Sequence, residues 1–224
     1  MEMVLQSLRV ALPGIVQSFD PGPPATVKVL VATNELSTWN HGQGNQIAIA
    51  TESKQLPILC DVPVQLWGGG SWTVTFPIQP GDECMLVFAD TPLDVWFQNG
   101  DLDNRQIDQR RHTLSDGVAF VGIRSAPRGL ENYSRTSTQI RNDESTVVID
   151  LAPEGITITA PAVTVNATGA VTVNANEVDV NAETVTVDAE AVTIGAATKI
   201  DGKQFLLHKH AGVQTGSGST GSVV

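Results

Sequence analysis

Short runs of alternating apolar and polar residues recur in the first part of the chain. They read ATVKVLVA at 25–32, NQIAIAT at 45–51, SWTVTFPI at 71–78 and ECMLVFA at 83–89. Turn-forming segments separate them, namely PGPP at 21–24, GGG at 68–70 and QPGDE at 79–83. Alternation of this kind predicts β-strands, and no convincing amphipathic helix interrupts them. We therefore expect a small antiparallel domain built as a closed or partly closed barrel, which hides its sheet edges.

From about residue 143 the alternation becomes a repeat of apolar-x-apolar pairs. The pairs are Ile156/Ile158, Val163/Val165, Val171/Val173, Val178/Val180, Val185/Val187 and Val192/Ile194, at steps of seven or eight residues. In an extended strand each pair lies on one face, because successive side chains point to opposite sides. A single chain of such short units has nothing against which to bury that face. The pattern predicts three identical chains wound around a common axis, with the pairs inward and the acids outward.

Other arrangements account for this repeat less well. A single-chain β-helix of hexapeptide units has a different period, and the calcium-binding nonapeptide roll needs Gly-Gly-x-Gly-x-Asp loops that this sequence lacks. A disordered tail would contain fewer β-branched residues, because exposed Val-x-Val runs aggregate. We therefore predict an obligate homotrimer in which folding and association of the shaft are one event.

The net charge of −11 is unevenly distributed. Residues 1–142 carry −4, residues 143–201 carry −9, and residues 202–224 carry +2. Phosphate binding needs clustered Lys and Arg, so the acidic middle segment argues against nucleic acid as a partner. Seven arginines do cluster between 105 and 141, which we interpret as a connector or a protein-contact surface: Arg105, Arg110, Arg111, Arg124, Arg128, Arg135 and Arg141.

Several residue types are most simply structural. Cys60 and Cys84 stand alone in the sequence and are expected to be reduced core residues. The tryptophans and phenylalanines of the first region are expected to pack in the core and at its rim; the tryptophans are Trp39, Trp67, Trp72 and Trp96. The N-terminus does not resemble a secretory signal, and no apolar run is long enough to span a bilayer, so we expect synthesis in the cytoplasm.

A His-x-His pair, His208 and His210, lies close to the C-terminus. In an extended segment both imidazoles point to the same side, so three chains would bring six of them to one point on the axis. Six nitrogen ligands fit an octahedral transition metal. The residues alone admit nickel, cobalt or zinc, although zinc usually takes four ligands. All positions would be filled by protein, which predicts a structural metal rather than a catalytic one. His41 and His112 stand alone, and no function is assigned to them.

Nearly the whole chain resembles the central spike, or membrane-piercing tail-tip, proteins of contractile-tailed bacteriophages, of the type with an N-terminal OB-fold domain. The resemblance rests on LPGIVQSFDP at 12–21, the segments 56–90 and 112–128, the valine repeat, and the terminal HKHAGVQTGSGSTG. It implies an all-β protein with an OB-fold barrel, an intertwined three-chain β-helix and a small metal-capped apex. It also implies one iron ion per trimer, held by His208 and His210 of each chain.

We accordingly expect an OB-fold-like barrel over 1–128, a connector over 129–142, a trimeric β-helix shaft over 143–202 and an apex over 203–224. The expected function is that of a structural virion protein at the tail tip or baseplate, not an enzyme. It would bind a baseplate hub or tail tube protein through its N-terminal domain and contact the host outer membrane transiently. The alternatives are the tip of a phage-derived contractile injection system and, less favoured, a carbohydrate-binding or carbohydrate-degrading tail protein.

Overall fold

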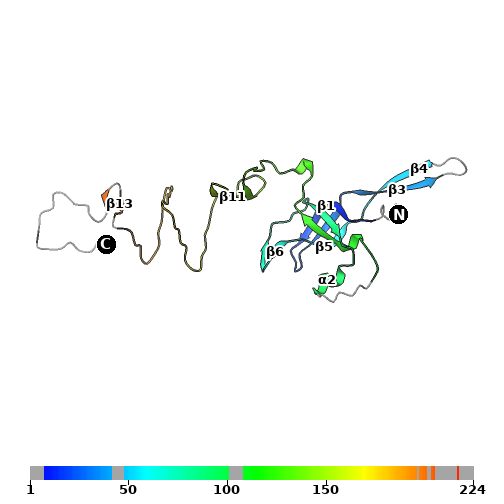
Figure 1. Cartoon of the computed structure of the whole chain (residues 1–224), viewed down its shortest axis with the longest axis horizontal. Helices are drawn as coiled ribbons and strands as arrows, with labels where there is room; N and C mark the ends of the chain where they lie inside the picture. The colour runs from blue at the N-terminus through cyan, green and yellow to red at the C-terminus, as the bar shows by residue number, and fades with distance from the viewer. Residues whose placement is uncertain are drawn as a thin grey trace. The chain divides into compact units, whose positions relative to one another are not determined.

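The computed structural model describes residues 8–41, 48–100, 108–195, 197–200, 203–204 and 216 (Figure 1). The chain divides into two compact units, Met1–Val163 and Thr164–Val224. Secondary structure in the described ranges is almost entirely β, which confirms the all-β prediction. The exceptions there are helix α2 (Asp94–Asn99) and the 3-10 turns η1 (Leu114–Asp116) and η2 (Ala126–Arg128). None of these has the length and apolarity of a membrane-spanning helix.

A five-stranded antiparallel sheet forms the body of the first unit. In spatial order it contains β5 (Leu59–Pro63), β2 (Thr26–Val31), β1 (Ala11–Asp20), β8 (Glu83–Phe88) and β9 (Gly117–Val121). A parallel bridge joins Val64, just after β5, to Ala119 on β9, and the amide of Gln65 donates to the Ala119 carbonyl at 3.0 Å. The two outer strands therefore meet and the sheet curls into a half-barrel, consistent with the expected N-terminal barrel.

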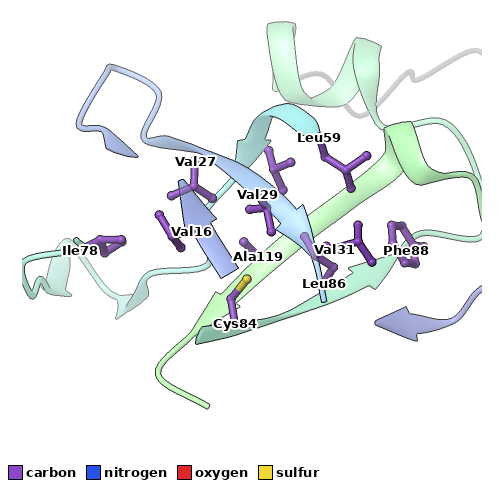
Figure 2. Packing of buried hydrophobic residues seen from close by; sticks show 11 residues of the cluster. Val16, Val27, Val29, Val31, Leu59, Ile78, Cys84, Leu86, Phe88 and Ala119 are labelled. Atoms are coloured by element: carbon purple, nitrogen blue, oxygen red, sulfur yellow. The ribbon is translucent and has the colours of Figure 1, made fainter. Parts of the chain in front are cut away.

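The core of this half-barrel follows the alternation seen in the sequence (Figure 2). Strand β2 turns Val27, Val29 and Val31 inward, while the residues between them are more exposed. Strand β8 likewise turns Cys84, Leu86 and Phe88 inward. The remaining buried apolar side chains come from strands β1, β5 and β9 and from Ile78, which lies outside the strands. The full set is Val16, Val27, Val29, Val31, Leu59, Val62, Ile78, Cys84, Leu86, Phe88 and Ala119. Apolar burial on one face of each strand is what stabilises a sheet of this size.

Two hairpins extend from the barrel as separate two-stranded sheets. One pairs β3 (Asn34–His41) with β4 (Ala48–Gln55), and the other pairs β6 (Trp67–Gly69) with β7 (Trp72–Val74). The expected strand at 71–78 is shortened to β7, since no strand is assigned over 75–79. Ile78 nonetheless reaches the core.

The expectation that the tryptophans pack in the core and at its rim is wrong for Trp67 and Trp72. Trp67 and Trp72 lie on the β6–β7 hairpin, which carries them away from the core, and Trp72 is 83% exposed. Trp96 on α2 is about half exposed. Trp39 belongs to β3, and its side chain lies outside the described residues. A short local hairpin has no second layer to cover its apolar face, which explains the exposure.

The two cysteines differ, and only one fits the predicted role. Both thiols are free, as expected, but Cys60 is exposed and only Cys84 belongs to the core. Cys60 lies on β5 one position out of phase with inward-facing Leu59, so its side chain points to the other face. Burial raises the pKa of the Cys84 thiol to about 11.

This difference predicts two phases in a thiol titration of the native protein. Cys60 is expected to react promptly with a disulfide reagent near pH 8, and Cys84 at least ~100-fold more slowly, because the reagent needs an accessible thiolate. Cys60→Ser should remove the fast phase and leave the slow one. Rapid modification of both thiols without unfolding would show that Cys84 is not sealed in the core.

Three further strands complete the described part of the first unit. They are β10 (Thr138–Arg141), β11 (Val148–Ala152) and β12 (Gly155–Thr159), which form an antiparallel sheet in that order. Ile156 and Ile158, the first pair of the repeat, thus lie in a strand that pairs within its own chain.

The described residues of the second unit contain little internal pairing. Strands β13 (Lys199–Ile200) and β14 (Lys203–Gln204) form a small ladder, and no strand is assigned over 164–195. The paired apolar residues of the repeat from Val163 onwards are between 52% and 71% exposed. The single chain therefore leaves the apolar pairs from Val163 to Ile194 uncovered, as the sequence pattern predicts.

Candidate functional site

The histidines predicted to bind metal, His208 and His210, lie outside the described residues. Within the ranges that the structure does describe, no three His, Cys, Asp or Glu side chains are grouped closely enough to hold a metal ion. One polar site in those ranges is a joint where the barrel meets the β10–β12 sheet.

The first half of this joint holds the segment after β9 against the barrel. Glu83, at the start of β8, accepts hydrogen bonds from the amide and the hydroxyl of Ser125, both at 2.6 Å. These bonds hold the pKa of the Glu83 carboxyl below its usual value. Arg128 adds a hydrogen bond to the Gly81 carbonyl. The chain leaving the barrel is therefore attached at two neighbouring points of β8 and its preceding turn.

The second half of the joint links that segment to the β10–β12 sheet. Both terminal nitrogens of Arg124 donate to Asp143, in the turn between β10 and β11, each at 2.8 Å. This bidentate pairing lowers the pKa of Asp143 and raises that of Arg124. Planar two-point contacts of this kind restrict orientation as well as distance. Because both side chains are solvent-accessible, the pair contributes more to orientation than to stability.

A surface hollow of about 820 Å³ lies over the joint, lined by residues that include Phe76, Ile123, Arg124 and Glu144. Its apolar walls come from both the barrel and the connector, which contributes Leu130, and its charged groups are largely those already paired in the joint. Bound carboxylates with lowered pKa values are poor proton donors, since a general acid needs a raised pKa. The paired groups hold the segment after β9 to the barrel and to the β10–β12 sheet.

A buried carboxylate that sequence reasoning missed anchors the long segment between β8 and β9. Asp116 is 1% exposed and accepts hydrogen bonds from Arg110 Nε at 2.9 Å and Thr113 Oγ1 at 2.6 Å. It also accepts from the Leu93 amide at 3.0 Å. Burial opposes ionisation of Asp116, but these hydrogen bonds outweigh it and keep its pKa below the usual value.

Arg110 is the centre of this network and is paired within its own chain. The role predicted for the arginine cluster, as a connector or a protein-contact surface, stays a prediction. Besides Asp116, Arg110 binds the carboxylates of Asp94 on α2 and Asp108. The sequence signal was weak: only the density of aspartates around Arg110 and Arg111 pointed to internal pairing. Arg124 and Arg128 are likewise engaged within the chain, and Arg105 lies outside the described residues.

His112 and Cys60 line a second hollow, of about 650 Å³. His112 Nε2 lies 3.3 Å from Asp90 Oδ1, whereas its Nδ1 is buried without a hydrogen-bond partner. His112 Nδ1 therefore makes no hydrogen bond to the Cys60 thiol, as the base of a thiol nucleophile would.

Residues 12–122 match the family model described as the phage protein Gp138 N-terminal domain. The match begins in β1 and ends just after β9, so it spans the half-barrel sheet and accounts for just under half of the chain. No curated protein sequence matches the chain. The fold and this match together support a structural phage protein of the tail or baseplate type, carried as a component of the virion.

Proposed function

We propose that the protein is the homotrimeric central spike at the tip of a contractile phage tail, which pierces the host outer membrane when the tail contracts. One observation carries the proposal: a half-barrel matched by a phage domain model is followed by a long series of apolar pairs with no cover in the single chain. A globular domain needs no such series, whereas a rod made from several copies does.

The strand order supports an OB-fold for the barrel. Along the chain, the five strands of the main sheet follow one another as β1, β2, β5, β8 and β9. Across the sheet their order is β5, β2, β1, β8 and β9, so the third strand of the chain lies at one edge and the fifth at the other. The parallel bridge between Val64 and Ala119 then brings the third and fifth together. A five-stranded, partly open barrel of this kind is typical of the OB-fold.

The shaft is proposed to be a three-chain β-helix. The apolar pairs point to a common axis, and residues between pair members point outward; Asp179, between Val178 and Val180, is one example. Burying an exposed valine contributes roughly 1.5 kcal/mol or more, and interchain backbone hydrogen bonds add to this. Isolated chains would have neither contribution, so the rod and the trimer form together.

The apex is proposed to hold one metal ion per trimer. His208 and His210 of each chain would supply six imidazole nitrogens, a donor set that fits octahedral iron and, as an alternative, nickel or cobalt. When bound, the ion supplies structural cross-linking, with no open position for substrate. The histidines themselves clamp the three chain ends together, which would otherwise fray under load.

The barrel is proposed to attach the spike to a hub or tail tube protein, and the protein is proposed not to be an enzyme. The exposed tryptophans of the β6–β7 hairpin suit a protein partner, because aromatic residues are enriched at interface cores. The joint suits force transmission, since it ties the barrel to the start of the β10–β12 sheet through paired charges. The acidic shaft should slide past anionic lipid rather than adhere to it.

Native mass measurement combined with elemental analysis tests this proposal. We expect three chains and one transition-metal ion for the unmodified protein. Replacing both His208 and His210 with alanine should remove the metal but leave the trimer assembled, because the shaft holds the chains together. A monomeric unmodified protein would contradict the spike, and metal retained by the double variant would mean that other residues bind it.

A further inference from the structure

The β10–β12 sheet has one apolar face with a regular layout. Its strand register places Ile140 opposite Ile149, and Ile149 opposite Ile158, so three isoleucines form a row across all three strands. A second row pairs Leu151 with Ile156. Val147 precedes Ile149 by two positions and has the same facing. We name these six residues the isoleucine collar: Ile140, Val147, Ile149, Leu151, Ile156 and Ile158.

The collar is uncovered, whereas the opposite face of the sheet has polar partners within the chain. The six side chains of the collar are between 38% and 69% exposed. On the other face, Gln139 donates to Asp150 at 2.6 Å, and Arg141 donates to the carbonyl of Asn132 and to the hydroxyl of Ser145. The asymmetry indicates that the polar face is completed by its own chain and that the apolar face is completed by something else.

The size of the collar restricts what can cover it. Three strands about 4.8 Å apart and about five residues long make a face of roughly 200 Å². A stable interface between separate proteins needs on the order of 800 Å² per partner, so the collar is too small to be a complete docking surface. It is large enough to be one layer of a longer interface.

The chain itself indicates which interface that is. Ile156 and Ile158 in the collar are also the first pair of the apolar repeat, and Val163 follows at the same spacing. Whatever covers the repeat therefore begins on the collar. We infer that the isoleucine collar is covered by the collars of two further copies of this chain, which meet there through side chains alone.

This inference rests on the proposed trimeric shaft and adds a distinct element to it. In the shaft, chains must exchange backbone hydrogen bonds, but the collar strands already pair within their own chain. The collar can therefore bring three folded chains together before any interchain ladder forms. That contact would set a common starting register for the repeat.

Ile158→Asp in the full-length protein tests the collar, with Thr159→Asp as the matched control on the same strand and the opposite face. Three uncompensated carboxylates would be buried at the axis in the first variant and none in the second. A dilution series followed by sedimentation velocity measures the protein concentration at which half of the trimer has dissociated. We expect Ile158→Asp to raise this concentration by at least ~100-fold and Thr159→Asp to raise it by less than ~3-fold. Protection of Cys84 from thiol reagent confirms in each case that the barrel is folded.

Cross-linking gives a second test that does not depend on tolerance of a buried charge. In a Cys60→Ser background, Ile149→Cys should form interchain products with a short bismaleimide, while Val148→Cys on the polar face should form few. Equal cross-linking of Ile149→Cys and Val148→Cys would overturn the collar but leave the trimeric shaft intact. The same conclusion would follow if the Ile158→Asp trimer were as stable as that of the unmodified protein. An unmodified protein that is a dimer or a monomer would contradict both the threefold collar and the threefold spike.

Discussion

Replacing Asp116 with alanine is expected to lower the free energy of unfolding of the barrel by about 3 kcal/mol. Removal of this buried carboxylate leaves the Leu93 amide and part of the Arg110 guanidinium without their acceptor. Leaving partners of a buried charged group unpaired is far more costly than the net gain from one hydrogen bond. Denaturant unfolding followed by tryptophan fluorescence measures the effect. Asp94→Ala is the control, because Asp94 also binds Arg110 but is about half exposed, and it should cost less than about 1 kcal/mol.

The Asp116 variant should also lose part of its acid sensitivity. The pKa of Asp116 is lower in the folded state than in the unfolded chain, where it is about 3.9. Its contribution to stability is therefore complete above that value and is lost as the pH falls through the lower, folded-state value. The unmodified protein should thus lose stability more steeply below about pH 4 than Asp116→Ala does. Parallel pH profiles for the two proteins would contradict an ionised, bonded Asp116.

Gly14→Val is the second large effect, and we expect a loss of about 3 kcal/mol in the free energy of unfolding. Gly14 lies in β1, paired with Val31 on β2 and Cys84 on β8, in the middle of the curled sheet. A Cβ atom at this position would lie 2.5 Å from Val29 Cγ1 and 3.1 Å from the Cys84 sulfur. Both neighbours are fully buried, so they cannot move aside without disturbing the core.

Gly69→Val is the matched control for this prediction. Gly69 is also a strand glycine, but a Cβ atom there would meet no atom within 4 Å. Valine has a higher strand propensity than glycine, so this variant should be neutral or slightly stabilising. The midpoint of thermal unfolding measures both variants. If Gly14→Val were as stable as Gly69→Val, the close packing of β1 against Val29 and Cys84 would have to be rejected.

The proposed trimer explains why so much of this chain is apolar yet exposed. In most single-chain domains an apolar row such as Ile140, Ile149 and Ile158 would pack against a second layer. Here the row and the valine pairs after it have no such layer in the described part of their own chain. Folding of the two regions is thus expected to differ: the barrel has its own core, whereas the shaft depends on association.

Local patterning was sufficient to predict much of this protein. Alternation of apolar and polar residues identified the inward faces of β2 and β8, because strand geometry alone sends alternate side chains to opposite faces. The same rule predicted that the valine pairs would find no cover in a single chain. His208 and His210 could be proposed as metal ligands only from their spacing and from the family resemblance, and they remain a prediction.

The residues that local patterning misjudged depend on contacts between distant segments. Cys60 and Cys84 have similar surroundings in the sequence, but the register of β5 exposes one and the centre of the sheet buries the other. Arg110 belongs to a charged segment of the sequence, yet in the structure it pairs with Asp116, which is buried. The isoleucine row exists only because β10, β11 and β12 align in one register. Each of these features depends on which distant segments pair and in which register. That choice is made by the packing free energy of the whole domain, so a short stretch of sequence does not predict it.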